Sequence, residues 1–118
     1  MKFLPTKDGK GNNFTISESG SVDGKLILDQ TFDGIDNTQA DGIIYIISGA
    51  GGASLYNPEL SDNPDLWKKE SGENWKPYTA RLVSDRHSFT IIETEGKNLI
   101  LKQYDENGNV FDEVKVTK

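Results

Sequence analysis

The chain has 118 residues, a formal net charge of −6, one histidine and no cysteine. Its length fits a single domain, and the acidic balance argues against nucleic-acid binding, which needs a positively charged surface. The absence of cysteine excludes disulfides, thiol catalysis and cysteine-bound zinc, while a single histidine excludes a two-histidine metal site within one chain. No apolar run approaches the roughly 20 residues of a membrane-spanning helix.

The first part of the chain predicts short strands joined by polar loops. Residues 1–12 are rich in Gly, Asn and Lys, which indicates a flexible lead-in, and they lack the apolar region of a signal peptide. Residues 13–17 alternate polar and apolar side chains, as a half-buried strand does, and residues 25–28 predict a second strand. The acidic segment 29–42 predicts a loop. The apolar, β-branched run 43–47 predicts a central strand buried on both faces.

The second part predicts one helical segment and four strands. Residues 58–69 favour a helix, with Pro64 suited to a first helical position. The predicted strands are residues 79–83, 88–94, 98–103 and 110–116, and Asn107-Gly108 indicates a hairpin between the last two. We therefore predict a mainly β fold (β-rich α+β): an antiparallel sheet or two-layer sandwich of six to seven strands, with one or two short helices, in a single domain over residues 1–118.

A glycine-rich loop follows the apolar run at Ser48, Gly49, Gly51 and Gly52. It misses the dinucleotide fingerprint because Ser54 stands where the third glycine belongs, and no P-loop Lys-Ser or Lys-Thr follows. The alternative interpretation is a strand end at which another backbone passes closely.

The excess of negative charge has a local origin. Five aspartates fall between residues 23 and 41, with one lysine among them. Calcium binds six to eight oxygen ligands, and loops dense in Asp, Asn and Gly supply them, although the spacing is not that of an EF-hand. The candidate ligands are Asp23, Asp29, Asp33, Asp36 and Asp41. The alternative is a solvated loop whose aspartates stabilise turns. Asp105, Asn107 and Asn109 also alternate like calcium ligands, with the hairpin as the alternative.

Two further features have structural and functional interpretations. His87 could act as a general base, yet no nucleophile has a local spacing that pairs with it, so a structural histidine is the alternative. The aromatic side chains Trp67, Trp75 and Tyr78 cluster near a proline-containing connector. They could stack on sugar rings or a partner surface, or cover the edge of a sheet as a lid.

Two stretches carry a family resemblance. Residues 42–56 (GIIYIISGAGGASLY) resemble the late strand and glycine-rich loop of calcineurin-like metallophosphoesterases, including purple acid phosphatases. Residues 86–97 (RHSFTIIETEGK), followed by residues 105–113 (DENGNVFDE), resemble the end of those proteins, where a His-Ser-Phe strand leads into a hairpin and a closing strand. Together the stretches cover 36 of the 118 residues.

The resemblance implies a C-terminal fragment of a longer, secreted or periplasmic phosphoester hydrolase. The dimetal ligands of that family lie in Asp-x-His, Gly-Asp, Gly-Asn-His and Gly-His-x-His motifs, none of which is present, so this chain does not encode the dimetal centre. By resemblance Ser48, Gly49, Gly51, Gly52 and His87 would line the rim of the parent active site. The implied partner is the catalytic domain of the same parent protein.

Three functional hypotheses result. The first is a non-catalytic C-terminal domain of a metallophosphoesterase, which completes a sheet and lines the rim of the parent active site. The second is a calcium-binding accessory module that uses the acidic loop 23–41. The third is a carbohydrate- or protein-binding β-sandwich that uses the aromatic side chains.

Overall fold

Strands account for most of the regular structure in the computed structural model, which describes residues 2–3, 13–16, 22–49, 51–67 and 78–118. Within these ranges lie β1 (Lys2–Phe3), β2 (Asn13–Ile16), β3 (Val22–Lys25), β4 (Thr79–Arg81), β5 (Ser88–Glu95), β6 (Asn98–Asp105) and β7 (Val110–Thr117). A 3-10 helix, η1 (Pro58–Leu60), and one turn of α-helix, α1 (Pro64–Trp67), precede β4. The predicted mainly β fold is confirmed.

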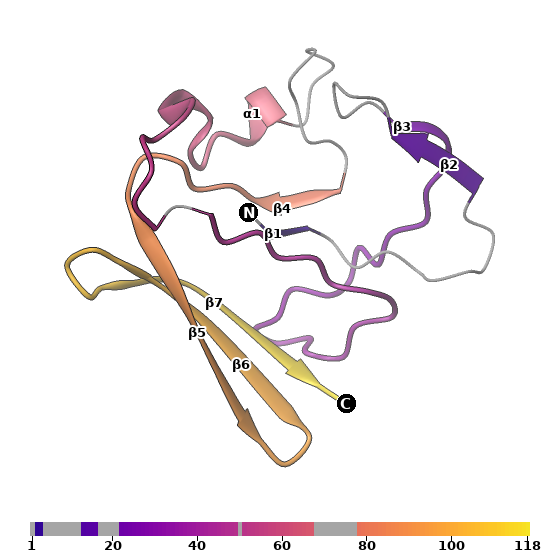
Figure 1. Cartoon of the computed structure of the whole chain (residues 1–118). Helices are drawn as coiled ribbons and strands as arrows, with labels where there is room; N and C mark the ends of the chain where they lie inside the picture. Colours follow the sequence, from indigo (N-terminus) through magenta and orange to yellow (C-terminus); the bar gives the residue numbers. More distant parts are fainter. Residues whose placement is uncertain (1, 4–12, 17–21, 50, 68–77) are drawn as a thin grey trace.

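The described strands form three antiparallel sheets (Figure 1). β1 pairs with β4, β2 pairs with β3, and β5, β6 and β7 form a three-stranded meander in chain order. The meander follows from its sequence, because its three strand segments are separated by turn residues at Gly96 and at Asn107-Gly108, and both glycines have positive φ. The predicted bounds of these three strands are correct at their first residues and one or two residues short at their ends.

The predicted central strand at 43–47 is wrong. Only isolated bridges occur there, at Ile43 and Ile46, and the side chains of Ile43, Tyr45 and Ile47 are exposed. Ile44 and Ile46 are half-buried, so the segment is extended with one face toward the protein rather than buried on both. Its β-branched composition favours extended backbone, but a strand also needs a continuous partner.

Other boundaries also differ from the prediction. The strand expected at 79–83 ends at Arg81, in β4. The strand expected at 25–28 lies earlier, in β3, and Leu28 keeps only an isolated bridge. The helix expected at 58–69 is divided into η1 and α1; Pro64 does begin α1, as predicted, and residues 68–69 lie outside the described residues. Of the predicted lead-in 1–12, residues 2–3 form β1 and residues 4–12 lie outside the described residues.

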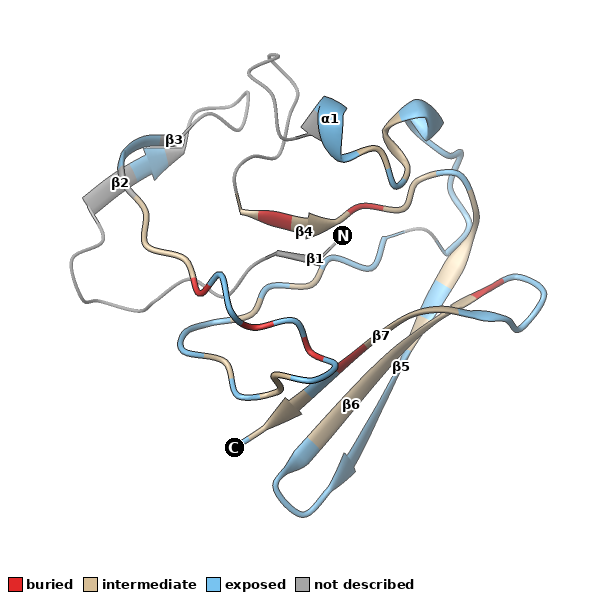
Figure 2. Cartoon of the chain, turned by 180° about the vertical axis from the view of Figure 1, so that it is seen from behind, coloured by how far each residue is buried: buried red, intermediate tan, exposed pale blue. Residues whose placement is uncertain are grey.

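The buried apolar side chains in the described part of the chain are Phe32, Leu82 and Val114. They come from the acidic loop, the segment after β4 and the last strand, and Figure 2 shows this loop lying against β7. The backbone of the loop extends the sheet, because Lys115 N–H donates to Gly34 C=O and Thr117 N–H donates to Thr38 C=O, both at 2.8 Å. The acidic loop is therefore a structural part of the core as well as a surface feature.

Candidate binding cleft

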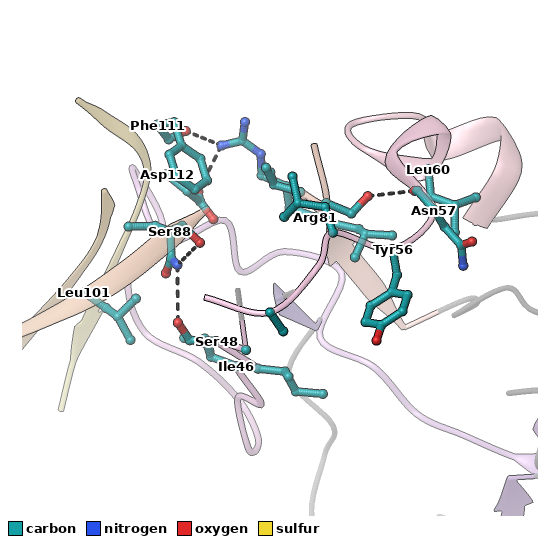
Figure 3. A pocket seen from close by; sticks show the side chains of 18 of the residues that line it. Ile46, Ser48, Tyr56, Asn57, Leu60, Arg81, Ser88, Leu101, Phe111 and Asp112 are labelled. Carbon is teal, nitrogen blue, oxygen red and sulfur yellow. Dashed lines mark hydrogen bonds and ion pairs between the residues drawn. The ribbon is translucent and has the colours of Figure 1, made fainter. Parts of the chain in front are cut away.

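A cleft with a cavity volume of about 300 Å³ opens between three parts of the chain. Its walls are residues 46–49 and 53–57, residues 81–84 at and after the end of β4, and the face of the β5–β7 sheet that carries Ser88, Gln103 and Val114 (Figure 3). Most of the lining side chains are apolar, among them Ile46, Leu82 and Leu101. This volume lies at the lower end of the range of small-molecule sites.

The polar side of the cleft is organised by Gln103. Its Nε2 donates to Ser88 Oγ at 2.9 Å and to Ser48 Oγ at 3.3 Å, while its Oε1 accepts a hydrogen bond from Thr90 Oγ1. Thr90 Oγ1 also lies 2.7 Å from Ser48 Oγ. Ser88, Thr90 and Gln103 share one face of the sheet because of the two-residue period of β5 and β6 and their pairing in register. The result is a cluster of hydroxyl and amide groups at one end of an apolar cleft.

Arg81 also lines the cleft, with its guanidinium beside Asp112, the register partner of Gln103, and its charge is already balanced. Its Nε and Nη2 donate to the two carboxylate oxygens of Asp62 at 2.9 and 2.7 Å, and Nη1 donates to the carbonyl of Phe111 and lies 3.4 Å from Asp112 Oδ1. This pairing raises the pKa of Arg81 and lowers that of Asp62. A ligand that is itself an anion would have to compete with two carboxylates for this guanidinium.

In their described contacts, the Ser48 and Ser88 hydroxyls bond to an amide. Ser48 and Ser88 bond to Gln103, whose amide neither accepts nor releases a proton at ordinary pH. His87, the predicted candidate base, is half-buried and engaged in an interaction of its own, and it is not among the residues that line the cleft. These described bonds make a hydrogen-bonding cluster of hydroxyl and amide groups on the wall of the cleft.

The glycine-rich loop is only partly in the cleft. Ser48 and Gly49 line it, whereas Gly51 and Gly52 do not. In the described part of the chain no atom lies within 4 Å of where a Cβ would stand on Gly49, Gly51 or Gly52, so the expected close backbone approach is wrong. Gly52 has φ of +151°, a conformation that side-chain-bearing residues rarely adopt.

Two aspartates of the acidic loop hold its backbone. Asp29 Oδ1 accepts hydrogen bonds from Thr31 N–H, Thr31 Oγ1 and Phe32 N–H, and its Oδ2 accepts one from Asp41 N–H at 2.9 Å. These bonds lower the pKa of Asp29 to about 2. Asp33 Oδ1 likewise accepts from the N–H groups of three residues, Ile35, Asp36 and Asn37, at 2.8–2.9 Å, which lowers its pKa.

The other predicted calcium ligands, Asp23, Asp36 and Asp41, are exposed. Among the residues that the structure describes, no group of three or more His, Cys, Asp or Glu side chains is arranged to hold a metal ion. In the hairpin, the buried Asp105 accepts from Asn107 N–H, Asn109 N–H and Asn109 Nδ2, so its carboxylate stabilises the turn. Calcium binding stays a prediction.

The structure describes the side chain of only one member of the predicted aromatic cluster, Tyr78. Trp75 lies outside the described residues, and the side chain of Trp67, at the end of α1, is likewise not described. Tyr78 is half-buried, and this burial raises the pKa of its hydroxyl. Another aromatic residue, Tyr56, lines the cleft with an exposed side chain.

Sequence reasoning missed the residues that shape the cleft: Tyr56, Asp62, Arg81, Thr90 and Gln103. For Thr90 and Gln103 a signal existed, because polar side chains at alternating positions of two adjacent predicted strands fall on one face. No such signal exists for Arg81 and Asp62, whose contact depends on how β4 passes the η1–α1 segment.

The chain matches no family model, and neither curated proteins nor solved structures gave a match. Within the described ranges, no helix has the length and apolar character needed to cross a membrane.

Proposed function

We propose that this chain is a non-catalytic binding domain, and that its cleft takes an uncharged ligand with a mostly apolar body and one or two hydrogen-bonding groups. The observation that carries the proposal is the composition of the cleft: apolar walls, a Gln103-centred cluster of hydroxyl and amide groups, and an arginine whose charge carboxylates already neutralise. Apolar pockets with a few directed polar groups are the usual form of small-ligand sites.

The neutrality of the ligand follows from the electrostatics of the cleft. Arg81 faces Asp62 and Asp112, so it offers little attraction to an anion. A cationic ligand would have to pay for desolvation in a mostly apolar space, with both nearby carboxylates already bonded to Arg81. An uncharged group can instead exchange hydrogen bonds with Gln103 and the neighbouring hydroxyls at little cost.

A fragment screen by nuclear magnetic resonance tests this proposal. Neutral aromatic or aliphatic fragments with an amide or hydroxyl group are expected to shift the backbone amide signals of Ser48, Leu55, Ser84 and Gln103. Gln103→Leu keeps the side-chain volume but removes the amide, so it should weaken these fragments about tenfold, the value of one hydrogen bond.

Thr94→Val, which removes a hydroxyl from the same sheet face outside the cleft, is the matched control and should leave affinity unchanged. Binding only by charged fragments, or shifts confined to residues away from the cleft, would contradict the proposal.

A second proposal, that the parent protein is a metallophosphoesterase, has one supporting observation. The two stretches that carry the resemblance, residues 42–56 and 86–97, lie side by side, with Ser48 bonded to Thr90 and close to Ser88 through Gln103. In this proposal Ser48, Gly49, Gly51, Gly52 and His87 form the rim of an active site whose dimetal centre belongs to the catalytic domain of the same secreted or periplasmic protein.

The gene tests this second proposal directly. Reading-frame sequence upstream of residue 1 should encode the Gly-His-x-His motif and its companions. The chain by itself should not hydrolyse a generic phosphoester in the presence of manganese, zinc or iron, and clear metal-dependent turnover would count against a non-catalytic role.

A further inference from the structure

Among the described strands, β5 is at the edge of its sheet and pairs only with β6. The β5–β6 hairpin has a two-residue loop, Gly96-Lys97, so Glu95 and Asn98 flank it as a hydrogen-bonded pair. Counting back from Glu95, every second residue of β5 therefore directs its backbone N–H and C=O groups toward β6. The residues between them direct their backbone groups away from the sheet. The outward residues are Ser88, Thr90, Ile92 and Thr94. No described residue makes a backbone hydrogen bond to this outward side.

The exposed edge is eight residues long, and its apolar residues lie in its first five positions. Phe89, Ile91 and Ile92 are 50%, 41% and 59% exposed, and β5 contains no proline, no lysine and no break in its register with β6. Prolines, lysines and β-bulges are features by which native proteins prevent edge strands from pairing with other chains. Figures 1 and 2 show the β5–β6 hairpin extending away from the rest of the chain, with its β5 side exposed. An edge of this kind favours the addition of another strand.

The opposite edge of the same sheet is already covered. Lys115 and Thr117 of β7 donate their N–H groups to Gly34 and Thr38 of the acidic loop. In the described chain the sheet therefore has one covered edge and one open edge. A second copy that pairs through the same strand closes both open edges at once, whereas a separate extended peptide would present a new open edge of its own.

The charge pattern of β5 fits pairing with itself. Its two carboxylates, Glu93 and Glu95, lie at one end, and Phe89 lies near the other. Antiparallel pairing about a two-fold axis at Ile91 places Glu93 opposite Phe89 of the second copy and Glu95 opposite the second copy's His87. No like charges face each other, and the two acidic ends lie at opposite ends of the interface.

We infer that two copies of this chain associate through β5, antiparallel and centred on Ile91, to form a continuous six-stranded sheet. In this register the outward groups of Thr90 and Ile92 bond across the interface. Ile91 directs its backbone to β6 and so forms a non-hydrogen-bonded pair with its copy, where Cα atoms stand about 4.5 Å apart, a separation that a disulfide can span.

That spacing permits a direct test by disulfide formation. The chain has no cysteine, so a single introduced cysteine reports only on its own position. Ile91→Cys should form a covalent dimer in a mildly oxidising glutathione buffer. Val110→Cys, at a position of similar exposure (47%) on the opposite edge strand, is the matched control and should remain largely monomeric.

Sedimentation equilibrium on the unmodified chain gives an independent test. We expect a concentration-dependent monomer–dimer equilibrium that Ile92→Lys weakens about tenfold, because the change occurs twice in the dimer, while Val110→Lys has little effect. An unmodified chain that stays monomeric up to millimolar concentration overturns the inference. So does cross-linking of Ile91→Cys that is no faster than that of Val110→Cys, or a dimer that the two lysine variants weaken equally.

Discussion

The carboxylate of Asp29 stabilises the acidic loop, a role that the surrounding sequence only partly indicates. Its side chain is 5% exposed and accepts hydrogen bonds from Thr31, Phe32 and Asp41, which brings the two ends of the acidic loop together. The density of Asp, Asn and Gly in this loop predicts either turn stabilisation or calcium binding. Composition does not single out Asp29 among the five aspartates, because its bond to Asp41 spans twelve residues.

Asp29→Ala should therefore cost about 2–3 kcal/mol in the free energy of unfolding, because it leaves three backbone N–H groups without their acceptor and one of them belongs to the buried Phe32. Urea unfolding followed by circular dichroism measures this change. Asp36→Ala, which removes an exposed carboxylate from the same loop, should change stability by less than about 0.5 kcal/mol. Equal effects of the two substitutions would show that Asp29 does not hold the loop.

At the scale of elements, the local sequence pattern was enough to predict the strands of the β5–β7 meander. It was not enough to predict the structure of residues 43–47. Each hairpin of the meander joins neighbouring segments through a short turn, so alternation and turn residues specify both the strands and their pairing. The run 43–47 has a stronger apolar signal than any of these strands. Whether this run forms a strand depends on which segment, distant in sequence, lies beside its backbone. The composition of the run does not predict that neighbour.

The packing of the acidic loop on β7 gives a sharp prediction at Gly34. This residue has φ of +72°, and a Cβ on it would stand 2.3 Å from Val114 Cγ2. Gly34→Ala should destabilise the fold by roughly 2–4 kcal/mol, through backbone strain and a clash in the core.

Gly96→Ala is the matched control for thermal unfolding of Gly34→Ala. Gly96 has φ of +58° but open space around it, so only the backbone term of about 1–2 kcal/mol applies. If Gly34→Ala were no more harmful than Gly96→Ala, the close contact with Val114 would be refuted.

For the whole molecule, the cleft was the part least accessible to sequence reasoning. Ser48 was singled out as part of a glycine-rich loop, yet its partners Thr90 and Gln103 lie 42 and 55 residues away. Arg81 meets Asp62 across 19 residues and the carbonyl of Phe111 across 30. Polar patterns within strands could suggest which face each side chain occupies, but the convergence of three separate segments is a property of the tertiary fold.

Acid should destabilise the whole molecule in a defined range. Hydrogen bonds and ion pairs lower the pKa of five carboxyl groups. The pKa values of Asp29 and Asp85 fall to about 2. The others are Asp33, Asp62 and Asp105. The unfolded chain, in which carboxyl groups titrate near pH 4, then binds more protons than the folded chain between about pH 4 and 2.

The stabilisation from these groups is therefore complete above about pH 4 and is lost as the pH falls toward 2. Urea midpoints measured from pH 6 to pH 2 should fall across this range, and less steeply in Asp29→Asn than in Asp36→Asn. A flat profile would mean that the native bonds of these carboxylates contribute nothing to stability.

The contact between the acidic loop and β7 also fixes an order of events during synthesis. Phe32 and Gly34 leave the ribosome some eighty residues before Val114, the side chain against which Gly34 packs, and β1 is made long before its partner β4. The early part of the chain therefore lacks its packing partners when it is synthesised. Asp29 can form only the hydrogen bonds within its own loop at that stage. The β5–β7 hairpins need only neighbouring residues, so they are expected to form first and to serve as the template on which the older segments settle.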